Sequence, residues 1–240
     1  MTSGVFERHE IKYLIDSRQR AAVERALRGH MAPDMYGESS IISLYYDTPD
    51  SRMIRRSLEK PEYKEKLRLR SYGTAEADRE IFVELKKKVG GIVYKRRISV
   101  PEHEATDWLA GKTGLPVNCQ IGREIDYVNR FYGGLVPAMY LSYDRIAYFD
   151  PEDAGLRVTF DRNIRWRTEN LSLTKAPAGE MLIRPDISLL EIKTARAVPM
   201  WLVKALEENK IRQTSFSKYG AAYTANTFRE KENKGGFLSA

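Results

Sequence analysis

The chain has 240 residues, of which 42% are hydrophobic and 30% are charged, a composition typical of a folded protein and not of a disordered one. It carries 40 Lys and Arg against 33 Asp and Glu, and the net charge of +7 makes the placement of charge more informative than its sum. The single cysteine, Cys119, excludes an internal disulfide framework and a cysteine-based zinc site.

The sequence carries no sign of export or of membrane insertion. Its first residues, MTSGVFERHEIKY, lack the apolar segment of a signal peptide, and no run of about 18 apolar residues occurs anywhere. We therefore expect a cytoplasmic protein with no membrane insertion. Residues 5–226 are expected to form a single domain, followed by a flexible charged tail over 227–240.

Eight segments have the two-residue period of a β-strand, and five have helical patterns between or after them. In chain order the expected strands are 6–15, 39–48, 63–73, 79–89, 91–100, 139–149, 156–167 and 188–194. The expected helices are 17–28, 102–110, 123–132, 200–208 and 217–227. Because strands and helices do not alternate strictly, the pattern predicts an α+β fold built on an antiparallel sheet.

The segment KEKLRLR, residues 64–70, has a cation at every second position. Side chains of a strand alternate between its two faces, so Lys64, Lys66, Arg68 and Arg70 share one face and Leu67 lies on the other. Neighbouring cations on that face are roughly 7 Å apart and repel each other if they are partly shielded from water. The face is therefore either fully solvated or in contact with an anion.

Other expected strands repeat this charged face. Sorting by parity places Lys12 with Glu10, Glu84 with Lys86 and Lys88, and Lys95 with Arg97, and it places Arg157 with Thr159 and Asp161. For one strand, solvent exposure is the simpler explanation. Repeated Arg and Lys across several strands instead favours a closed antiparallel β-barrel with a charged lumen and helices packed outside.

A basic lumen suits a multivalent anion, and phosphate is the usual partner of arginine and lysine side chains. Carboxylates among these cations could hold Mg²⁺ or Mn²⁺, which bridge protein oxygens to substrate phosphates, so Glu10, Glu84 and Glu191 are the candidate metal ligands. The three histidines are scattered, and no P-loop, GxGxxG or GxSxG motif occurs. Phosphate would therefore be held by side chains.

Seven motifs, in order, resemble those of a known family: HEIKY (9–13), KLRLRSYG (66–73), FVELKKKVGGIVYKRR (82–97), YDRIAYF (143–149), LRVTFDRNI (156–164), LLEIK (189–193) and FSKY (216–219). The chain is similar in them to the VTC domain, the polyphosphate polymerase module of the vacuolar transporter chaperone family, here as a stand-alone bacterial-type member. This family belongs to the CYTH-like triphosphate tunnel metalloenzymes. The resemblance implies the triphosphate tunnel fold, with charged walls and outer helices.

The resemblance also implies roles for individual residues. It implies a catalytic, phosphate-binding set of Lys12, Arg68, Arg70, Lys86, Arg145 and Arg157. Further substrate contacts are expected from Lys66, Lys88, Lys95, Arg97, Lys193 and Lys218. Among the carboxylates, Glu191 matches the metal-coordinating position of the family, with Glu84 and Glu10 as additional candidates.

Two positions depart from related patterns. The related CYTH branch opens with ExExK, whereas this chain has Arg8, Glu10 and Lys12 at those positions, which favours the polymerase branch. Ser215 stands where some relatives carry a lysine, which leaves the handling of the product chain open. The SPX and transmembrane segments of the eukaryotic complex do not occur in the sequence, so coupled translocation across a membrane is not expected.

The expected activity is the transfer of the γ-phosphoryl group of ATP, or of another nucleoside triphosphate, to a growing inorganic polyphosphate chain. Mn²⁺ or Mg²⁺ is the expected cofactor. A triphosphatase would differ only in using water as the acceptor, and a non-catalytic module would bind polyphosphate or nucleotide without turnover. Tyrosines among the basic strands (Tyr45, Tyr46, Tyr72 and Tyr94) could suggest single-stranded nucleic-acid binding, but carboxylates on the same faces argue against a nucleic-acid partner.

Overall fold

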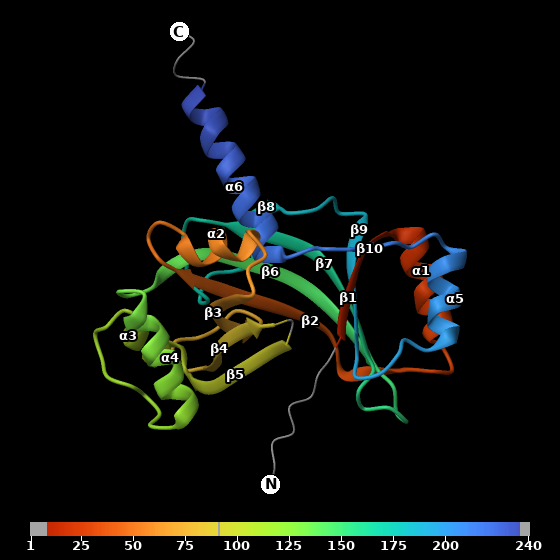
Figure 1. Ribbon diagram of the computed structural model, residues 1–240, viewed down its shortest axis with the longest axis horizontal. Coiled ribbons are helices and arrows are strands. Elements are labelled where there is room, and N and C mark those ends of the chain that lie inside the picture. The colour runs from red at the N-terminus through yellow and green to blue at the C-terminus, as the bar shows by residue number, and fades with distance from the viewer. Residues whose placement is uncertain (1–8, 91, 236–240) are drawn as a thin grey trace. The chain divides into compact units, whose positions relative to one another are not determined.

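The computed structural model of the protein describes residues 9–90 and 92–235 (Figure 1). The chain divides into two compact units. The first comprises Met1–Ser40, Tyr143–Ile164 and Ile183–Phe216, and the second comprises Ile41–Ser142, Arg165–Leu182 and Ser217–Ala240. Three long strands, β2 (Ala32–Asp47), β6 (Val136–Phe149) and β7 (Arg157–Arg167), begin in one unit and end in the other.

The first unit contains β1 (His9–Asp16), β9 (Ile187–Thr194) and the two-residue β10 (Gln213–Thr214). These strands and the first half of β7 follow the order β10-β1-β9-β7, and neighbouring strands are antiparallel. The register places Glu191 of β9 between Lys12 of β1 and Thr159 of β7. Because directly paired residues of a sheet share a face, these three side chains point to the same side.

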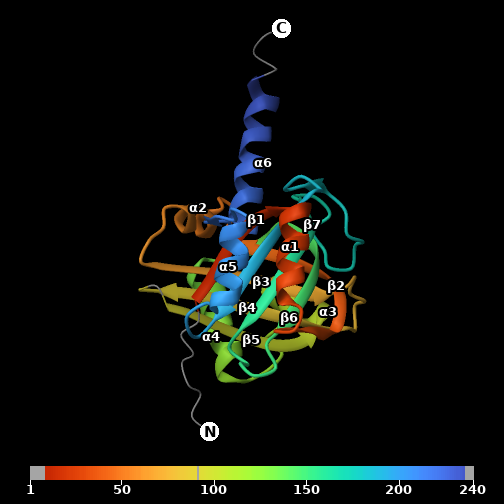
Figure 2. The same ribbon diagram turned by 90° about the vertical axis from the view of Figure 1, so that its right-hand side faces the viewer.

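Two helices, α1 (Ser17–Leu27) and α5 (Met200–Glu208), lie side by side over the strands of the first unit (Figure 2). Helix α1 begins with a capping box, in which the Asp16 carboxylate accepts from the Gln19 backbone N–H and the Gln19 side chain accepts from the Asp16 N–H. Apolar side chains of both helices and of the strands form one core, which includes Ile15, Val23, Leu27, Val158, Phe160, Leu190, Ile192, Leu202 and Leu206.

The second unit contains the antiparallel order β2-β3-β4-β5, with β3 (Tyr63–Tyr72), β4 (Glu80–Val89) and β5 (Ile92–Pro101). The short β8 (Glu180–Met181) pairs with the end of β7. The described residues of this unit form the helices α2 (Arg52–Leu58), α3 (Glu102–Leu109), α4 (Gln120–Phe131) and α6 (Lys218–Gly235).

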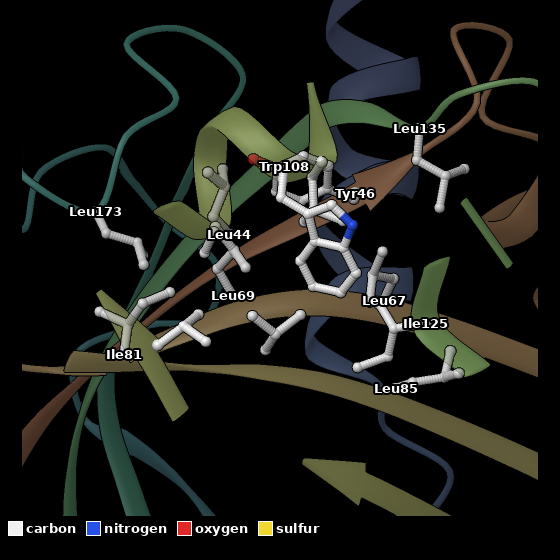
Figure 3. Close-up of a cluster of buried hydrophobic side chains, with 14 of the residues drawn as sticks. Leu44, Tyr46, Leu67, Leu69, Ile81, Leu85, Trp108, Ile125, Leu135 and Leu173 are labelled. Atoms are coloured by element: carbon white, nitrogen blue, oxygen red, sulfur yellow. The ribbon is translucent and has the colours of Figure 1, made fainter. Parts of the chain in front are cut away.

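The core of the second unit packs α3 and α4 against one face of this sheet. Trp108 of α3 and Ile125 of α4 lie over leucines of β3 and β4, as Figure 3 shows. Leu67, Leu69, Ile81, Val83 and Leu85 are fully buried, and each such side chain stabilises the fold by about 1.5–3 kcal/mol. All five have the parity opposite to that of the cations, so burial of one face presents the charged face on the other.

Helix α4 approaches the preceding loop closely at Gly122. A Cβ atom at this position would lie 2.6 Å from the Val117 carbonyl oxygen and 3.0 Å from a methyl group of Leu115. The Gly122 backbone N–H donates to the Cys119 Sγ at 3.3 Å, so the only cysteine caps this helix. A glycine is therefore required at position 122 for this loop to pack against α4.

The α+β fold with an antiparallel sheet is confirmed. In each unit the described strands follow an open order, and the closed barrel stays a prediction, as does the single-domain boundary at 5–226. Each of the eight expected strands and five expected helices has a counterpart, but β2 begins seven residues before the expected strand 39–48. Residues 6–8 and 91 of the expected strands lie outside the described residues. Within 9–90 and 92–235, no helix is long and apolar enough to cross a bilayer.

Two expectations about local structure are wrong. The last helix was expected to end at Thr227, but α6 continues to Gly235 through most of the segment expected to be a flexible tail. Helix α2 was not predicted, because its seven residues, RMIRRSL, follow a left-handed Ser51 with φ 58°, whose side chain does not cap the helix. Its first turn is instead held by Asp47, whose carboxylate accepts from the backbone N–H groups of Met53 and Ile54.

Candidate functional site

The second unit presents a strongly basic strand face, opposite the core. We call it the cation face and define it by eight cations and one carboxylate: Lys64, Lys66, Arg68, Arg70, Glu84, Lys86, Lys88, Lys95 and Arg97. The strand register aligns them in rows across the sheet. Lys66, Lys86 and Lys95 form one row, and Arg68, Glu84 and Arg97 form the next.

Directly opposed like charges repel each other, and this face places lysines opposite lysines. Lys66 is paired with Lys86, and Lys86 is paired with Lys95 on its other side. Lys64 is paired with Lys88 in the same way, and burial together with the nearby lysines lowers the pKa of Lys64. An anion bound over these rows would reduce the repulsion.

Glu84 is at the centre of the cation face. Its carboxylate is buried, with only 2% of the side chain exposed, and it lies 2.8 Å from Arg68, 2.8 Å from Lys95 and 2.6 Å from Arg97. Arg70 lies 3.8 Å away. Burial alone would raise the pKa of Glu84, but the positive charges of Arg68, Arg70 and Lys95 outweigh it and hold the pKa well below its usual range. One carboxylate thus fixes the positions of four cations.

The start of α6 lies at the edge of the same face. Ser217 Oγ accepts from the Gly220 N–H at 3.2 Å and also from Lys66 Nζ at 3.2 Å. The ammonium of Lys66 lies 5.9 Å from the ring centroid of Tyr219. Lys218 is the first residue of this helix, so the FSKY motif places its lysine beside the cation face.

The first unit holds a charged cluster around Glu191, which is 5% exposed. The carboxylate lies 3.7 Å from Lys12, 3.5 Å from Arg145 and 3.5 Å from Lys193. Lys12 also pairs with Glu10 at 2.9 Å and donates to the backbone carbonyl of Phe216. Two of the three candidate metal ligands, Glu10 and Glu191, therefore contact the same ammonium group.

Arg145 is held by Asp161 in this cluster. Its Nε and Nη2 donate to the two carboxylate oxygens of Asp161 at 2.5 Å and 2.7 Å, and Asp161 is fully buried. Burial opposes the charge of Arg145, but Tyr143, Asp161 and Glu191 together raise its pKa above the usual value. The sequence grouped Asp161 with a charged strand face but did not identify it as the partner that orients Arg145.

Arg157 lies in a more exposed position. Its guanidinium pairs with Asp34 of β2, and 45% of its side chain is exposed. On the sheet it is directly paired with Lys193 of β9. The side chain of Arg157 is thus more exposed than those of Arg145 and Arg70, although all three were predicted to bind phosphate.

The cluster around Glu191 suits a divalent cation whose remaining ligands would come from the substrate. Thr159 Oγ1 is buried beside its register partner Glu191 and has no hydrogen-bond partner among the described residues. An orphaned oxygen next to a carboxylate suits a hard, oxygen-liganded ion. No group of three His, Cys, Asp or Glu in the described chain could hold a metal ion without further ligands.

Glu84 fits a metal less well than Glu10 and Glu191 do. Both of its oxygens contact cations at 2.6–2.8 Å, Oε2 with Arg68 and Oε1 with Lys95 and Arg97, whereas the cations around Glu191 lie 3.5–3.7 Å from its oxygens. A metal ion at Glu84 would have to displace these groups and stand among their positive charges. Of the three predicted ligands, Glu10 and Glu191 thus belong to the first unit, and Glu84, surrounded by cations, belongs to the second.

The chain matches the VTC domain family over residues 7–226. A search of curated proteins finds no match. Among solved structures, a proposed adenylyl cyclase from Hippeastrum, described as having a dominant triphosphatase activity, is 18% identical with a TM-score of 0.53, covering 91% of this chain and 96% of that one. A proposed adenylate cyclase from Bacillus halodurans is 12% identical with a TM-score of 0.53, covering 88% of this chain and 95% of that one. These structures are similar in fold.

Proposed function

The chain belongs to the VTC domain family, and on this basis we propose that it is a polyphosphate polymerase that transfers the γ-phosphoryl group of ATP to a growing phosphate chain. The cation face is the observation that carries the proposal. Its eight cations accompany a single carboxylate, an excess suited to a polyanion. The cations from Lys64 to Arg70 extend over about 20 Å of strand, which suits a chain of phosphates better than one phosphate group.

The arginines of the cation face would bind and orient the reacting phosphates. Arg68, Arg70 and Arg97 present planar forks that match phosphate oxygens, and Glu84 holds them in place before substrate arrives. Lys86 would stabilise the charge that develops on the transferring group, since preorganised cations in a partly buried site need no rearrangement during the reaction. We assign Glu84 the role of positioning residue.

The lysines of the cation face would hold the phosphate chain. Lys66, Lys88 and Lys95 supply ammonium groups, which act as point charges. A phosphate chain can move past point charges more easily than past arginines that bind it through two hydrogen bonds, and a growing chain has to move. Lys218, at the first turn of α6, would contribute in the same way. Transfer needs no side-chain nucleophile, because the acceptor is itself a phosphate oxygen that attacks in line.

In the first unit, Glu191 and Glu10 would hold the divalent metal, with Thr159 beside Glu191. When bound, Mn²⁺ or Mg²⁺ would neutralise charge on the phosphate oxygens. Lys12, Arg145, Arg157 and Lys193 keep their proposed role as phosphate ligands of this unit. Asp161 orients the guanidinium of Arg145 through its two hydrogen bonds.

A triphosphatase is the second candidate, because the Hippeastrum protein of similar fold is described with that activity. It would use the same phosphate ligands with water as acceptor. A binding module without turnover would use them as well. A nucleic-acid partner is disfavoured, because single-stranded nucleic acids stack their bases on exposed aromatic rings, whereas Tyr45 and Tyr46 are buried.

Competition binding tests phosphate recognition. We expect tripolyphosphate to displace a fluorescent ATP analogue from the protein, and a single-stranded oligonucleotide at equal phosphate concentration to leave it bound. The opposite order would contradict the assignment of the cation face to triphosphates and favour nucleic acid. If neither compound displaces the ATP analogue, both a triphosphate and a nucleic acid are excluded as partners of the cation face.

Glu191→Gln is expected to lower ATP turnover by about a hundredfold at fixed Mn²⁺, because the substitution removes a metal-ligand charge. Raising the Mn²⁺ concentration should recover part of the loss. Initial rates of ADP formation across a Mn²⁺ series measure both effects. Glu24→Gln is the control, since Glu24 lies on α1 and pairs with Arg20 of the same helix. Turnover in Glu191→Gln that equals the wild-type rate at every Mn²⁺ concentration would remove Glu191 from the metal site.

A further inference from the structure

Tyr45 lies on the cation face although it carries no charge. In the β2–β3 register it is directly paired with Arg68, so its side chain points to the same side as that guanidinium. The Tyr45 hydroxyl accepts a hydrogen bond from Arg68 Nη1 at 2.9 Å. The residue is only 7% exposed. A buried phenol thus sits within contact of the arginine on which the proposed phosphate site depends.

The ring of Tyr45 is fixed by a second tyrosine. It stacks on Tyr219 of α6, with ring centroids 4.4 Å apart and an angle of 22° between the planes. The Tyr219 hydroxyl donates to the Asp47 carboxylate at 2.9 Å, and Asp47 is fully buried, where it also holds the first turn of α2. This stack prevents the phenol from turning away from the cation face, so its hydroxyl is preorganised.

The hydroxyl still has a proton to donate. Its oxygen accepts from Arg68, and within 9–90 and 92–235 no side chain or carbonyl is positioned to accept the Tyr45 proton. A buried donor without an acceptor is destabilising, because it has lost its bond to water. A phosphate oxygen held by Arg68 would supply the missing acceptor.

We propose that Tyr45 is a further substrate-contacting residue, whose hydroxyl donates a hydrogen bond to a phosphate oxygen bound at Arg68. This rests on the proposed function of the cation face. The phosphate would then have one neutral hydrogen-bond donor among the charged donors of the neighbouring arginine and lysine side chains. A neutral donor helps to orient the phosphate and does not add to the repulsion among the cations.

The electrostatics around Tyr45 strengthen the donor. Burial alone would raise the pKa of Tyr45, but the positive charges of Arg68, Lys66 and Arg70 outweigh it and lower the pKa to about 8. At neutral pH the phenol keeps its proton and is more acidic than an ordinary tyrosine. Hydrogen bonds to charged acceptors are the stronger ones, and they strengthen further in a partly desolvated site.

Tyr45→Phe removes the hydroxyl and keeps the ring stack. We expect it to raise the Kd for tripolyphosphate at pH 7 about tenfold, as measured by isothermal titration calorimetry, because a hydrogen bond to a charged group is lost. Tyr46→Phe is the matched control, since Tyr46 lies on the opposite face within the hydrophobic core, and its Kd should equal that of the wild type. Thermal unfolding of each variant checks that the fold is kept.

A double variant separates direct contact from an effect through Arg68. Arg68→Lys removes the Nη1 that donates to Tyr45 while keeping a positive charge. If Tyr45 contacts phosphate itself, Tyr45→Phe should still weaken tripolyphosphate binding severalfold in the Arg68→Lys background. If the second substitution has no further effect there, Tyr45 acts only through Arg68 and the proposal is overturned.

The pH dependence supplies an independent readout. Between pH 7 and 9 the phenol loses its proton, so it can no longer donate and adds a negative charge against the phosphate. Wild-type affinity for tripolyphosphate should therefore fall more over this range than the affinity of Tyr45→Phe. The groups that face Tyr45 (Lys66, Arg68 and Arg70 of β3, Glu84 of β4 and Tyr219 of α6) are common to both proteins. Parallel pH profiles would contradict the proposal.

Failure of this proposal differs from failure of the proposed function. If Arg68→Lys weakens tripolyphosphate binding and Tyr45→Phe binds as the wild type does, the phosphate site stands and the contact with Tyr45 is rejected. If the wild-type protein does not bind tripolyphosphate at all, both the phosphate site and the contact are rejected.

Discussion

Replacing Arg68 by alanine should lower kcat/KM for ATP by about a thousandfold. Arg68 gives Nε and Nη2 to Glu84 and Nη1 to Tyr45, so its fork is held on three sides before substrate binds. Removing one preorganised donor from a transition-state site typically costs 10²–10³ in rate, and Arg68 also carries a full charge. Steady-state ADP formation with Mn²⁺ measures the effect.

Arg96→Ala is the matched control for Arg68→Ala. Arg96 lies on β5 of the same sheet, but it has the opposite parity and pairs with Glu124 of α4 at 3.0 Å. Its loss removes one positive charge from the unit without touching the cation face. We expect its kcat/KM to stay within about twofold of the wild type. Equal losses in both variants would mean that total charge, and not the cation face, determines activity.

Neutralising Glu84 should destabilise the protein and make its stability depend on phosphate. Glu84→Gln leaves Arg68, Arg70, Lys95 and Arg97 without the buried carboxylate that they share. Breaking a buried ion pair costs about 3–5 kcal/mol, which corresponds to a Tm lower by roughly 6–20 °C in a protein of this size. Tripolyphosphate should raise the Tm of the variant by more than it raises that of the wild type, because it replaces the lost anion.

Glu65→Gln is the control for this anion rescue. Glu65 lies on β3 with the opposite parity, is 6% exposed and accepts from the hydroxyls of Tyr63 at 2.7 Å and Tyr132 at 2.9 Å. Burial and the Glu65 charge raise the pKa of Tyr132 to about 12, so this phenol remains a donor. Tripolyphosphate should stabilise Glu65→Gln no more than the wild type. Equal rescue of both glutamate variants would contradict the assigned role of Glu84.

The acid side of the stability profile provides a second check on Glu84. The folded state holds the pKa of Glu84 well below the value of about 4.3 that an unfolded glutamate has. Its contribution is therefore present above that value and is lost as the pH falls towards the folded-state pKa. The difference in Tm between the wild type and Glu84→Gln should accordingly shrink below about pH 4. A constant difference would mean that Glu84 is not charged in the folded protein.

Strand parity explains why the side chains that share the cation face could be predicted from sequence. In KEKLRLR the leucines alternate with the cations, and burial of Leu67 and Leu69 against Trp108 leaves only one direction for Arg68 and Arg70. The same alternation in β4 and β5 places Glu84, Lys86 and Arg97 correctly on that face. Local periodicity determined these orientations without any knowledge of tertiary contacts.

The contacts between these side chains could not be predicted in the same way. Glu84 was proposed as a metal ligand because parity shows a carboxylate among cations but not the distances between their atoms. The structure gives those distances, and four cations occupy the surroundings of this carboxylate. Register between strands, which a single sequence does not specify, decides such contacts.

Tyr45 was missed for a different reason. The segment SLYYD also alternates, so Ser43, Tyr45 and Asp47 have one parity and Leu44 and Tyr46 the other. Sorting this strand by parity would have placed a phenol beside the cations. Tyrosine is common in hydrophobic cores, and Tyr46 of the same segment is indeed a core residue, so residue type alone did not distinguish the two.

The fate of the γ-phosphate of ATP tests the proposed activity most directly. The purified protein would be incubated with ATP labelled at the γ-phosphate and with Mn²⁺, and the products resolved on a gel that separates phosphate chains by length. Polyphosphate synthesis predicts that the label appears in a ladder of long chains while ADP accumulates. Label released only as orthophosphate, or retained in ATP, would contradict the polymerase.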